Sequence, residues 1–225
     1  MNYLYEMKKT LLQLFILCFS FLAKGQEYFQ QEVNTEIAVK LNDQNHTLSA
    51  FETIEYINHS SDTLTELIFH LWPNAYKNNG TAMGKQNDAN GELEFHFADS
   101  IERGFIDSLD FKINEKAVSI IYHEDHLDIA TLKLNTPLLP NEKLIITTPF
   151  RVKLPLGIYS RLGHIGESYQ VTQWFPKPAV YDKDGWHPLP YLSQGEFYSE
   201  YGTYDVKITL PKNYVVGATG NLVNN

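Results

Sequence analysis

A histidine-rich stretch, "HEDH" at residues 123–126, is the first place where residue types suggest chemistry. In a metalloprotease helix, two histidines four positions apart flank a glutamate on one face and bind zinc. His123 and His126 are only three positions apart, in a polar stretch between two apolar runs. A solvated loop is therefore favoured over a zinc site.

Two further patterns fail the same kind of test. "DKDGW" at 182–186 begins like a calcium loop, which needs an oxygen ligand at its fifth position and a glutamate at its twelfth. Trp186 and Ser193 occupy those positions, so we expect a tight turn on Asp184 and Gly185. Ser160 lies near His164, but no G-x-S-x-G nucleophile elbow surrounds it. We expect neither catalytic nor metal-binding residues in this chain.

The stretch "TQWFPKPAVYDKDGWHPLPYLSQGEFYSEYG" at 172–202 is dense in aromatic residues and prolines. Such a density of prolines excludes a regular helix, because each interior proline removes a backbone hydrogen bond and clashes with the preceding turn. The stretch is therefore either a rigid path over the surface or the lining of a site.

The start of the chain has the layout of a secretory signal peptide. Lys8 and Lys9 precede an apolar run over 11–23, and Ala23-Lys24-Gly25 offers small residues for cleavage. The run is shorter than the roughly 20 apolar residues of a membrane-spanning helix. We expect residues 1–25 to be a signal peptide and the protein to be exported, whether periplasmic, outer-membrane-associated or secreted.

The composition of the chain excludes some classes of function for residues 26–225. The whole sequence has 225 residues and a formal charge of −9, and Cys18, its one cysteine, lies in the predicted signal peptide. An acidic domain lacks the basic footprint that nucleic-acid binding requires, so we expect no nucleic-acid partner. Residues 26–225 are long enough to form one domain held together by its core.

Alternation of apolar and polar residues with a period of two predicts strands along most of this domain. The expected strands are 33–41, 47–58, 64–72, 104–113, 116–122, 126–134, 144–152, 204–210 and 214–218. Pro140-Asn141 is a turn signal, so 126–134 and 144–152 are expected to form a hairpin. A short helix is expected within 82–97. The fold class is therefore all-β, an antiparallel sandwich or large twisted sheet.

The order of several motifs is more specific than any one of them. They are "HLWPNAY" (70–76), "SRLGH" (160–164), "YQVTQWFPKPAVYD" (169–182), "GWHPLPY" (185–191) and "GEFYSEYGTYDVKITLPKNYVVGATG" (195–220). This series resembles the N-terminal β domain of zinc aminopeptidases related to aminopeptidase N, in their exported bacterial branch. The resemblance extends from about Val33 to Asn221 and is strongest from Tyr169 onward.

The resemblance implies a saddle-shaped, noncatalytic β domain over 26–225 that packs on a catalytic domain of the same polypeptide. That catalytic domain would carry the zinc and the H-E-x-x-H motif, and would remove residues from the amino ends of peptide substrates. Neither the zinc ligands nor the last strands of the β domain occur in this sequence. It is thus expected to be a C-terminally truncated piece, without a cofactor and inactive alone.

The resemblance also implies a role for the start of the aromatic stretch. In the family, the matching segment reaches into the active-site cleft, and an acid or amide two residues after the glutamine holds the substrate's amine. Thr172 and Gln173 match, but the second position is Phe175, which cannot accept that hydrogen bond. Gln173, Trp174 and Phe175 are the candidate substrate-binding residues. Packing under the loop remains an alternative for both aromatic residues, because aromatic clusters usually form cores.

A different class of function also fits the composition. An exported β sandwich with 14 tyrosines and 3 tryptophans could be a stand-alone module that binds glycans or peptides. That alternative does not explain the ordered series of motifs.

Overall fold

The computed structural model describes residues 7–8, 28–195 and 197–223. The expected signal peptide, residues 1–25, therefore lies outside the described residues apart from positions 7 and 8. In the part of the chain that is described, no helix is both long enough and apolar enough to span a membrane.

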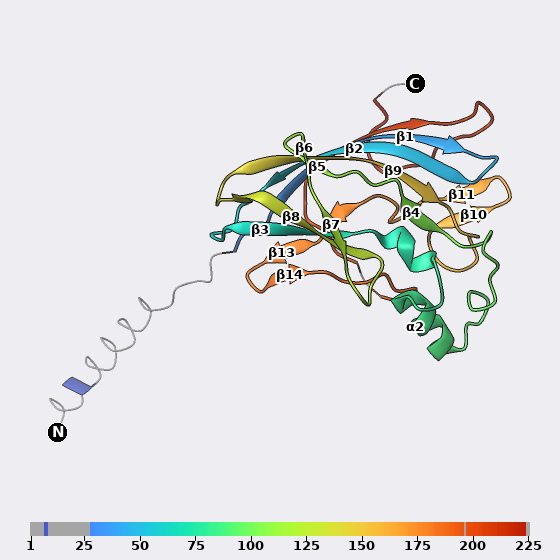
Figure 1. The fold of residues 1–225 in the computed structure, drawn as a ribbon, viewed down its shortest axis with the longest axis horizontal. Coiled ribbons are helices and arrows are strands. Elements are labelled where there is room, and N and C mark those ends of the chain that lie inside the picture. The colour runs from blue at the N-terminus through green and yellow to red at the C-terminus, as the bar shows by residue number, and fades with distance from the viewer. Residues whose placement is uncertain (1–6, 9–27, 196, 224–225) are drawn as a thin grey trace.

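The larger of two main sheets has seven strands in the order β15-β1-β2-β9-β5-β6, with β4 beside β9 (Figure 1). Its strands are β1 (Glu32–Asn42), β2 (Thr47–Ile57), β4 (Phe105–Asp107), β5 (Lys112–Ile113), β6 (Lys116–Ala117), β9 (Lys143–Lys153) and β15 (Tyr204–Thr209). The pairings are antiparallel except that of β15 with β1, which is parallel.

The smaller sheet has the order β12-β3-β8-β7 and is antiparallel. Its strands are β3 (Leu64–His70), β7 (Ile120–Tyr122), β8 (Ile129–Leu138) and β12 (Lys177–Pro178). Two hairpins complete the strands: β10 (Gly163–Ile165) with β11 (Ser168–Gln170), and β13 (Val180–Asp182) with β14 (Gly185–His187). The 3-10 helix η1 (Trp72–Tyr76) and the helix α2 (Ala82–Asn90) follow β3. The predicted all-β fold class is confirmed.

The core lies between the two sheets. Ile54 and Leu144 of the larger sheet form one buried cluster with Phe69 and Leu132 of the smaller sheet. In β1 every second residue from Val33 to Leu41 is buried, as its period-two pattern predicts. A second buried cluster includes η1, the start of α2 and Phe150 of β9.

The predicted hairpin between 126–134 and 144–152 is wrong. β8 pairs with β3 and β7, whereas β9 pairs with β2, β4 and β5. The turn at Pro140-Asn141 thus carries the chain from one sheet to the other. Alternation in sequence shows that each strand has a buried face, but it does not specify the neighbouring strand.

Other predicted elements need smaller corrections. Residues 214–218 form no strand, 104–113 breaks into β4 and β5, and 116–122 breaks into β6 and β7. The helix expected within 82–97 ends at Asn90, because Gly91 takes the left-handed conformation, with φ 78°, that commonly caps a helix.

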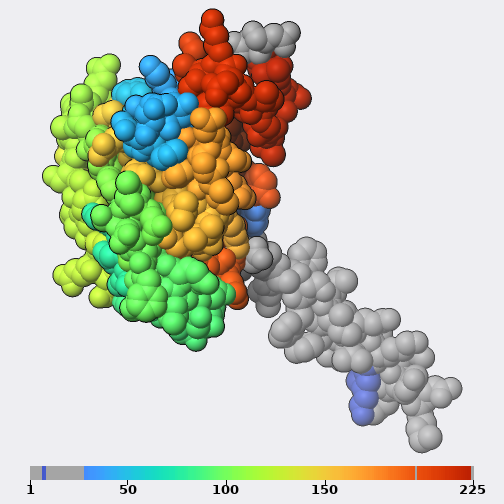
Figure 2. All heavy atoms as spheres, turned by 90° about the vertical axis from the view of Figure 1, so that its right-hand side faces the viewer, coloured from blue at the N-terminus to red at the C-terminus, as the bar shows by residue number. Residues whose placement is uncertain are grey.

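The strand β15 lies at the edge of the larger sheet, and Figure 2 shows the C-terminal residues in red beside the blue N-terminal strands. The preceding Gly202 approaches β1 so closely that a Cβ there would lie 1.8 Å from the carbonyl oxygen of Val33. Only glycine permits this approach. Tyr204, Val206 and Ile208 remain half exposed.

Candidate functional site

The segment that contains the candidate substrate-binding residues connects β11 to β13 and runs along the edge of the smaller sheet. The hydroxyl of Thr172 anchors its start by donating to the carbonyl oxygen of Arg161 at 2.8 Å. Gln173 then takes a left-handed backbone conformation, with φ 52°, which is uncommon for a residue other than glycine. At its end, β12 pairs Lys177 with His70 and Pro178 with Phe69 of β3.

Gln173, Trp174 and Phe175 are all half-buried. The Oε1 atom of Gln173 accepts a hydrogen bond of 2.7 Å from Nζ of Lys177. The Trp174 ring centroid lies 5.7 Å from that of Phe150 and 5.5 Å from that of Phe175. Both aromatic side chains pack against the core cluster around η1. Packing therefore accounts for part of each aromatic surface, and Gln173 is the polar member of the three.

Trp72 is the centre of the surrounding cluster. Its ring lies 4.5 Å from the stacked ring of His70, centroid to centroid, and 4.8 Å from Phe197. Nζ of Lys177 lies 4.2 Å from the Trp72 centroid, a geometry in which the indole π face attracts a cation. The indole Nε1–H donates to the carbonyl oxygen of Leu189 at 3.0 Å.

Burial lowers the pKa of both basic groups of this cluster, Lys177 and His70. It lowers the pKa of Lys177 to about 8, because the ammonium ion loses solvation. Burial, and secondarily the charge of Lys177, lowers the pKa of His70 to about 3. The backbone N–H of Leu189 donates to Nε2 of His70 at 3.1 Å, so the imidazole is neutral with its proton on Nδ1. That Nδ1 atom is buried and has no partner among the described residues.

We predict that His70 makes the domain acid-labile. The folded state keeps this imidazole neutral, whereas the unfolded state binds a proton on it near pH 6.5. The free energy of unfolding therefore has its full value above pH 6.5 and falls as the pH falls from 6.5 towards 3. At about pH 4.5 the loss amounts to about 2–3 kcal/mol. Urea denaturation of the wild type and of His70→Gln across this range measures it.

The variant His70→Gln should show a flatter decline in unfolding free energy than the wild type over the same pH range. The exposed His59 gives the matched control, since His59→Gln should leave the decline unchanged. Equal slopes for the wild type and His70→Gln would contradict the assignment.

The "HEDH" residues lie in the loop between β7 and β8. The rings of His123 and His126 are 5.0 Å apart and tilted by 35°, and Nδ1 of His123 accepts from the backbone N–H of Asp125. Within the described ranges, no three side chains from histidine, cysteine, aspartate and glutamate are grouped to hold a metal ion. His123 and His126 therefore do not fit a zinc site.

The "DKDGW" pattern forms the β13–β14 turn, as expected. The backbone N–H of Asp184 donates to Asp182 at 2.8 Å, Gly185 has φ 96°, and His187 bonds the same carboxylate at 2.8 Å. Ser160 shares a hydrogen bond of 3.0 Å with the hydroxyl of Tyr191, whereas the ring of His164 stacks on that of His46.

Sequence reasoning missed Lys177, His70 and Trp72 as members of the site. A lysine between two prolines in "FPKP" was the available signal, since both neighbours lack a backbone N–H and restrict the chain. The approach of His70 and Trp72 from 100 residues earlier depends on the pairing of β12 with β3.

Neither a protein-family model nor a curated protein matches the chain. Among solved structures, it is similar to an M1 zinc metallopeptidase from Deinococcus radiodurans bound to a Tyr-Ser-Ala substrate, with 14% identity and a TM-score of 0.46 over 88% of this chain and 36% of that chain. A second structure of an M1 zinc metallopeptidase from that organism gives 14% identity and a TM-score of 0.43, over 83% of this chain and 33% of that chain.

A nutrient-binding protein described as putative, from Legionella pneumophila, gives 12% identity and a TM-score of 0.34 over 56% of this chain and 40% of that chain. The chain thus spans about a third of the length of the two peptidases. They are zinc peptidases, the class that the motif order resembles.

Proposed function

We propose that this chain holds the noncatalytic N-terminal β domain of an exported zinc aminopeptidase. In this proposal the segment from Thr172 to Lys177 forms part of the wall of the substrate cleft. The catalytic domain of the same polypeptide is its partner, and peptides with free or modified amino ends are the substrates of the whole enzyme.

One observation carries the proposal: the motifs that make up the resemblance meet at Trp72. "HLWPNAY" supplies His70 and Trp72, and "YQVTQWFPKPAVYD" supplies Lys177. "GWHPLPY" supplies the backbone of Leu189, and the last motif supplies Phe197. Segments spread over more than 120 residues thus support one surface segment, which is what a positioned functional loop requires.

Gln173 is the residue of this segment best suited to touch a peptide. Its backbone has a positive φ, a strained conformation for a residue other than glycine. Such conformations occur often at functional sites, where the surrounding structure holds them in place. Because Oε1 already accepts from Lys177, the amide NH₂ group is the part left to donate to a carbonyl oxygen of a bound peptide. Phe175 adds an apolar surface next to it.

Zinc in the catalytic domain would polarise the scissile carbonyl and activate a water molecule. The residues of this chain bind and orient the peptide and keep water from part of the cleft. The isolated chain is expected not to hydrolyse aminoacyl-p-nitroanilides, and metal-dependent turnover by a homogeneous sample would contradict the proposal.

The test of the cleft role is Gln173→Ala in the full-length protein that the gene encodes. We expect kcat/KM for peptide substrates to fall by about tenfold, since one hydrogen bond to substrate is worth about 1 kcal/mol or somewhat more. Gln170→Ala is the matched control, because Gln170 is an exposed glutamine three positions earlier. Wild-type kinetics for Gln173→Ala would contradict the cleft role.

The alternative of a glycan-binding module has its own measurement. Binding of the full chain to a glycan array, together with a gene that encodes no H-E-x-x-H motif downstream, would replace the peptidase proposal.

A further inference from the structure

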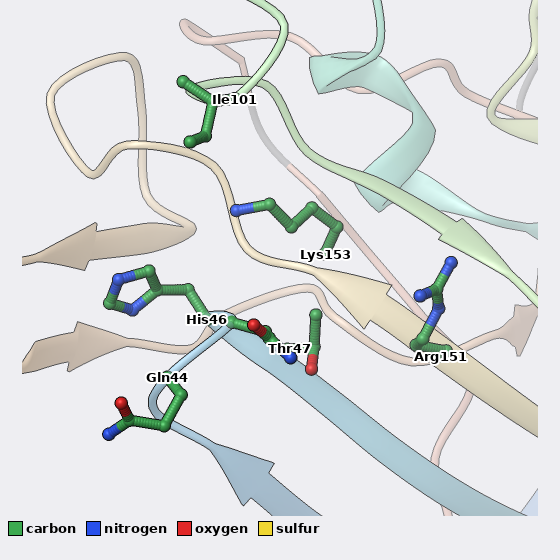
Figure 3. A pocket seen from close by; sticks show the side chains of 7 residues that line it. Gln44, His46, Thr47, Ile101, Arg151 and Lys153 are labelled. Carbon is green, nitrogen blue, oxygen red and sulfur yellow. The ribbon is translucent and has the colours of Figure 1, made fainter.

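A cavity of about 380 Å³ lies at one end of the larger sheet, away from the peptide segment in sequence (Figure 3). It is formed where the turn between β1 and β2 meets the end of β9 and the connection between α2 and β4. Its lining residues are Gln44, Asn45, His46, Thr47, Ile101, Arg151 and Lys153.

Lys153 is a cation without a counter-charge in this cavity. No carboxylate of the described residues lies within ion-pair distance of it, and its Nζ donates only to the backbone carbonyl of Leu154, at 3.3 Å. Figure 3 shows its ammonium group pointing into the space between His46 and Ile101. Arg151 in contrast forms a two-pronged pair with Asp107, with Nε–Oδ1 and Nη2–Oδ2 distances of 2.9 and 2.5 Å.

His46 lines this cavity and stacks on the imidazole of His164. The rings of His46 and His164 lie 3.5 Å apart, centroid to centroid, and are nearly parallel at 12°. Nδ1 of His46 shares a hydrogen bond of 2.8 Å with the hydroxyl of Tyr169. The backbone N–H of Leu154 donates to the carbonyl oxygen of His46 at 2.9 Å, which fixes the turn against the end of β9.

The pKa values of Lys153, His46 and His164 are all lowered, as expected for basic groups that are partly buried. Burial lowers the pKa of Lys153, of His46 and of His164, and the charge of Lys153 lowers the pKa of both histidines further. Asp43 acts in the opposite direction on His46, but its carboxylate accepts a hydrogen bond from the hydroxyl of Tyr214. The charge of Lys153 thus acts on both imidazoles, opposed at His46 by Asp43 and at His164 by the hydrogen bond to the carbonyl oxygen of Gly166.

We propose that this cavity is a binding site for a phosphate group, in which Lys153 supplies the principal positive charge and His46, whose ring stacks on that of His164, supplies a further hydrogen-bond donor. Gln44, Asn45 and Thr47, from the same turn as His46, line the cavity with neutral groups that can donate hydrogen bonds, and such bonds are stronger when the acceptor is a charged phosphate. A bound dianion supplies the missing counter-charge and favours protonation of the histidines. The site is independent of the proposed peptidase function.

A phosphate group is carried both by small soluble molecules and by lipid headgroups. The first experiment therefore titrates the full chain with inorganic phosphate and follows the histidine C2–H resonances by NMR, with sodium chloride at equal ionic strength as reference. We expect saturable shifts for His46 and His164 and an upward move of their titration midpoints. The other six of the 8 histidines should respond to phosphate as they do to chloride.

Substitutions of Lys153 then test whether its charge binds the phosphate. Lys153→Met should weaken phosphate binding by about tenfold to 150-fold, the range for loss of one charge-assisted hydrogen bond, and Lys153→Arg should retain most of it. Lys143→Met is the matched control, because Lys143 lies on the same strand and pairs with Glu55 at 2.7 Å. The Lys143 variant should bind phosphate as the wild type does.

A vesicle arm separates the two sources of phosphate. Co-sedimentation with phosphatidic acid vesicles, but not with phosphatidylcholine vesicles, that is lost in Lys153→Met identifies a lipid headgroup. Phosphate binding without co-sedimentation identifies a soluble phosphate compound. The proposal is overturned if His46 and His164 respond equally to phosphate and chloride, or if folded Lys153→Met binds phosphate as tightly as the wild type.

Discussion

Replacing Glu52 with leucine will stabilise the domain at neutral pH by about 1–3 kcal/mol, the usual cost of a buried polar group without a partner. Glu52 lies in the middle of β2, between Ile37 of β1 and Thr148 of β9, and is fully buried. Neither carboxyl oxygen has a hydrogen-bond partner among the described residues. Leucine is of similar size and needs no partner, so it removes that cost.

The pH dependence of the unfolding free energy is a second test of the cost of burying Glu52. Burial raises the pKa of Glu52 well above its ordinary value of 4.5. The folded state therefore keeps a proton that the unfolded state releases, and the unfolding free energy falls as pH rises above 4.5. Urea denaturation at several pH values should show this decline in the wild type and a smaller one in Glu52→Leu.

Two further variants make the result specific. Glu52→Gln removes the titration but keeps a buried polar group, so it should flatten the pH dependence with less gain in stability. Glu55→Gln, at a position that is paired with Lys143, should leave the pH dependence near that of the wild type. A lower stability of Glu52→Leu at neutral pH would show that the carboxyl group has a stabilising role.

Removing the indole of Trp72 should have the largest destabilising effect of the single changes considered for this domain. Trp72→Ala is expected to cost about 3–5 kcal/mol, the range for large aromatic side chains in cores. The residue is 2% exposed, and its Nε1–H group is hydrogen-bonded to Leu189. Its loss would leave a cavity, an unpaired carbonyl group and no support for the ring of His70.

Chemical denaturation followed by circular dichroism measures this change. Trp174→Ala is the matched comparison, because Trp174 is half-buried and should cost less. Trp72→Phe should lie between Trp72→Ala and the wild type. If Trp72→Ala proved no more destabilising than Trp174→Ala, Trp72 would not be the centre on which the four motifs depend.

The effect of Trp72 connects stability with the proposed function. Lys177 contacts both the Trp72 ring and the Oε1 atom of Gln173. Loss of the indole therefore releases Lys177, and with it the side-chain orientation of Gln173. In the proposed full-length enzyme, Trp72→Phe is the variant with which this coupling can be measured, because it keeps most of the core.

The sequence by itself determined which segments would be strands where a long alternation was present. β1, β2, β3, β9 and β15 lie within two residues of the predicted bounds at each end. The alternation predicts these strands correctly because β1, β2, β3 and β9 each have one face towards the core. In β15, the apolar positions pair with the residues of β1 that face the core. The turn at Asp184-Gly185 was also predictable, since it depends on local backbone preferences.

Pairing and the candidate site were decided by the tertiary structure. Nothing in residues 126–152 distinguishes a hairpin from a crossing between sheets, because the buried faces of β8 and β9 look the same in either case. The contact of Lys177 with Trp72 and the stacking of His46 on His164 depend on segments more than 100 residues apart. Local propensity acts between neighbours in the sequence, whereas these contacts follow from packing the two sheets against each other.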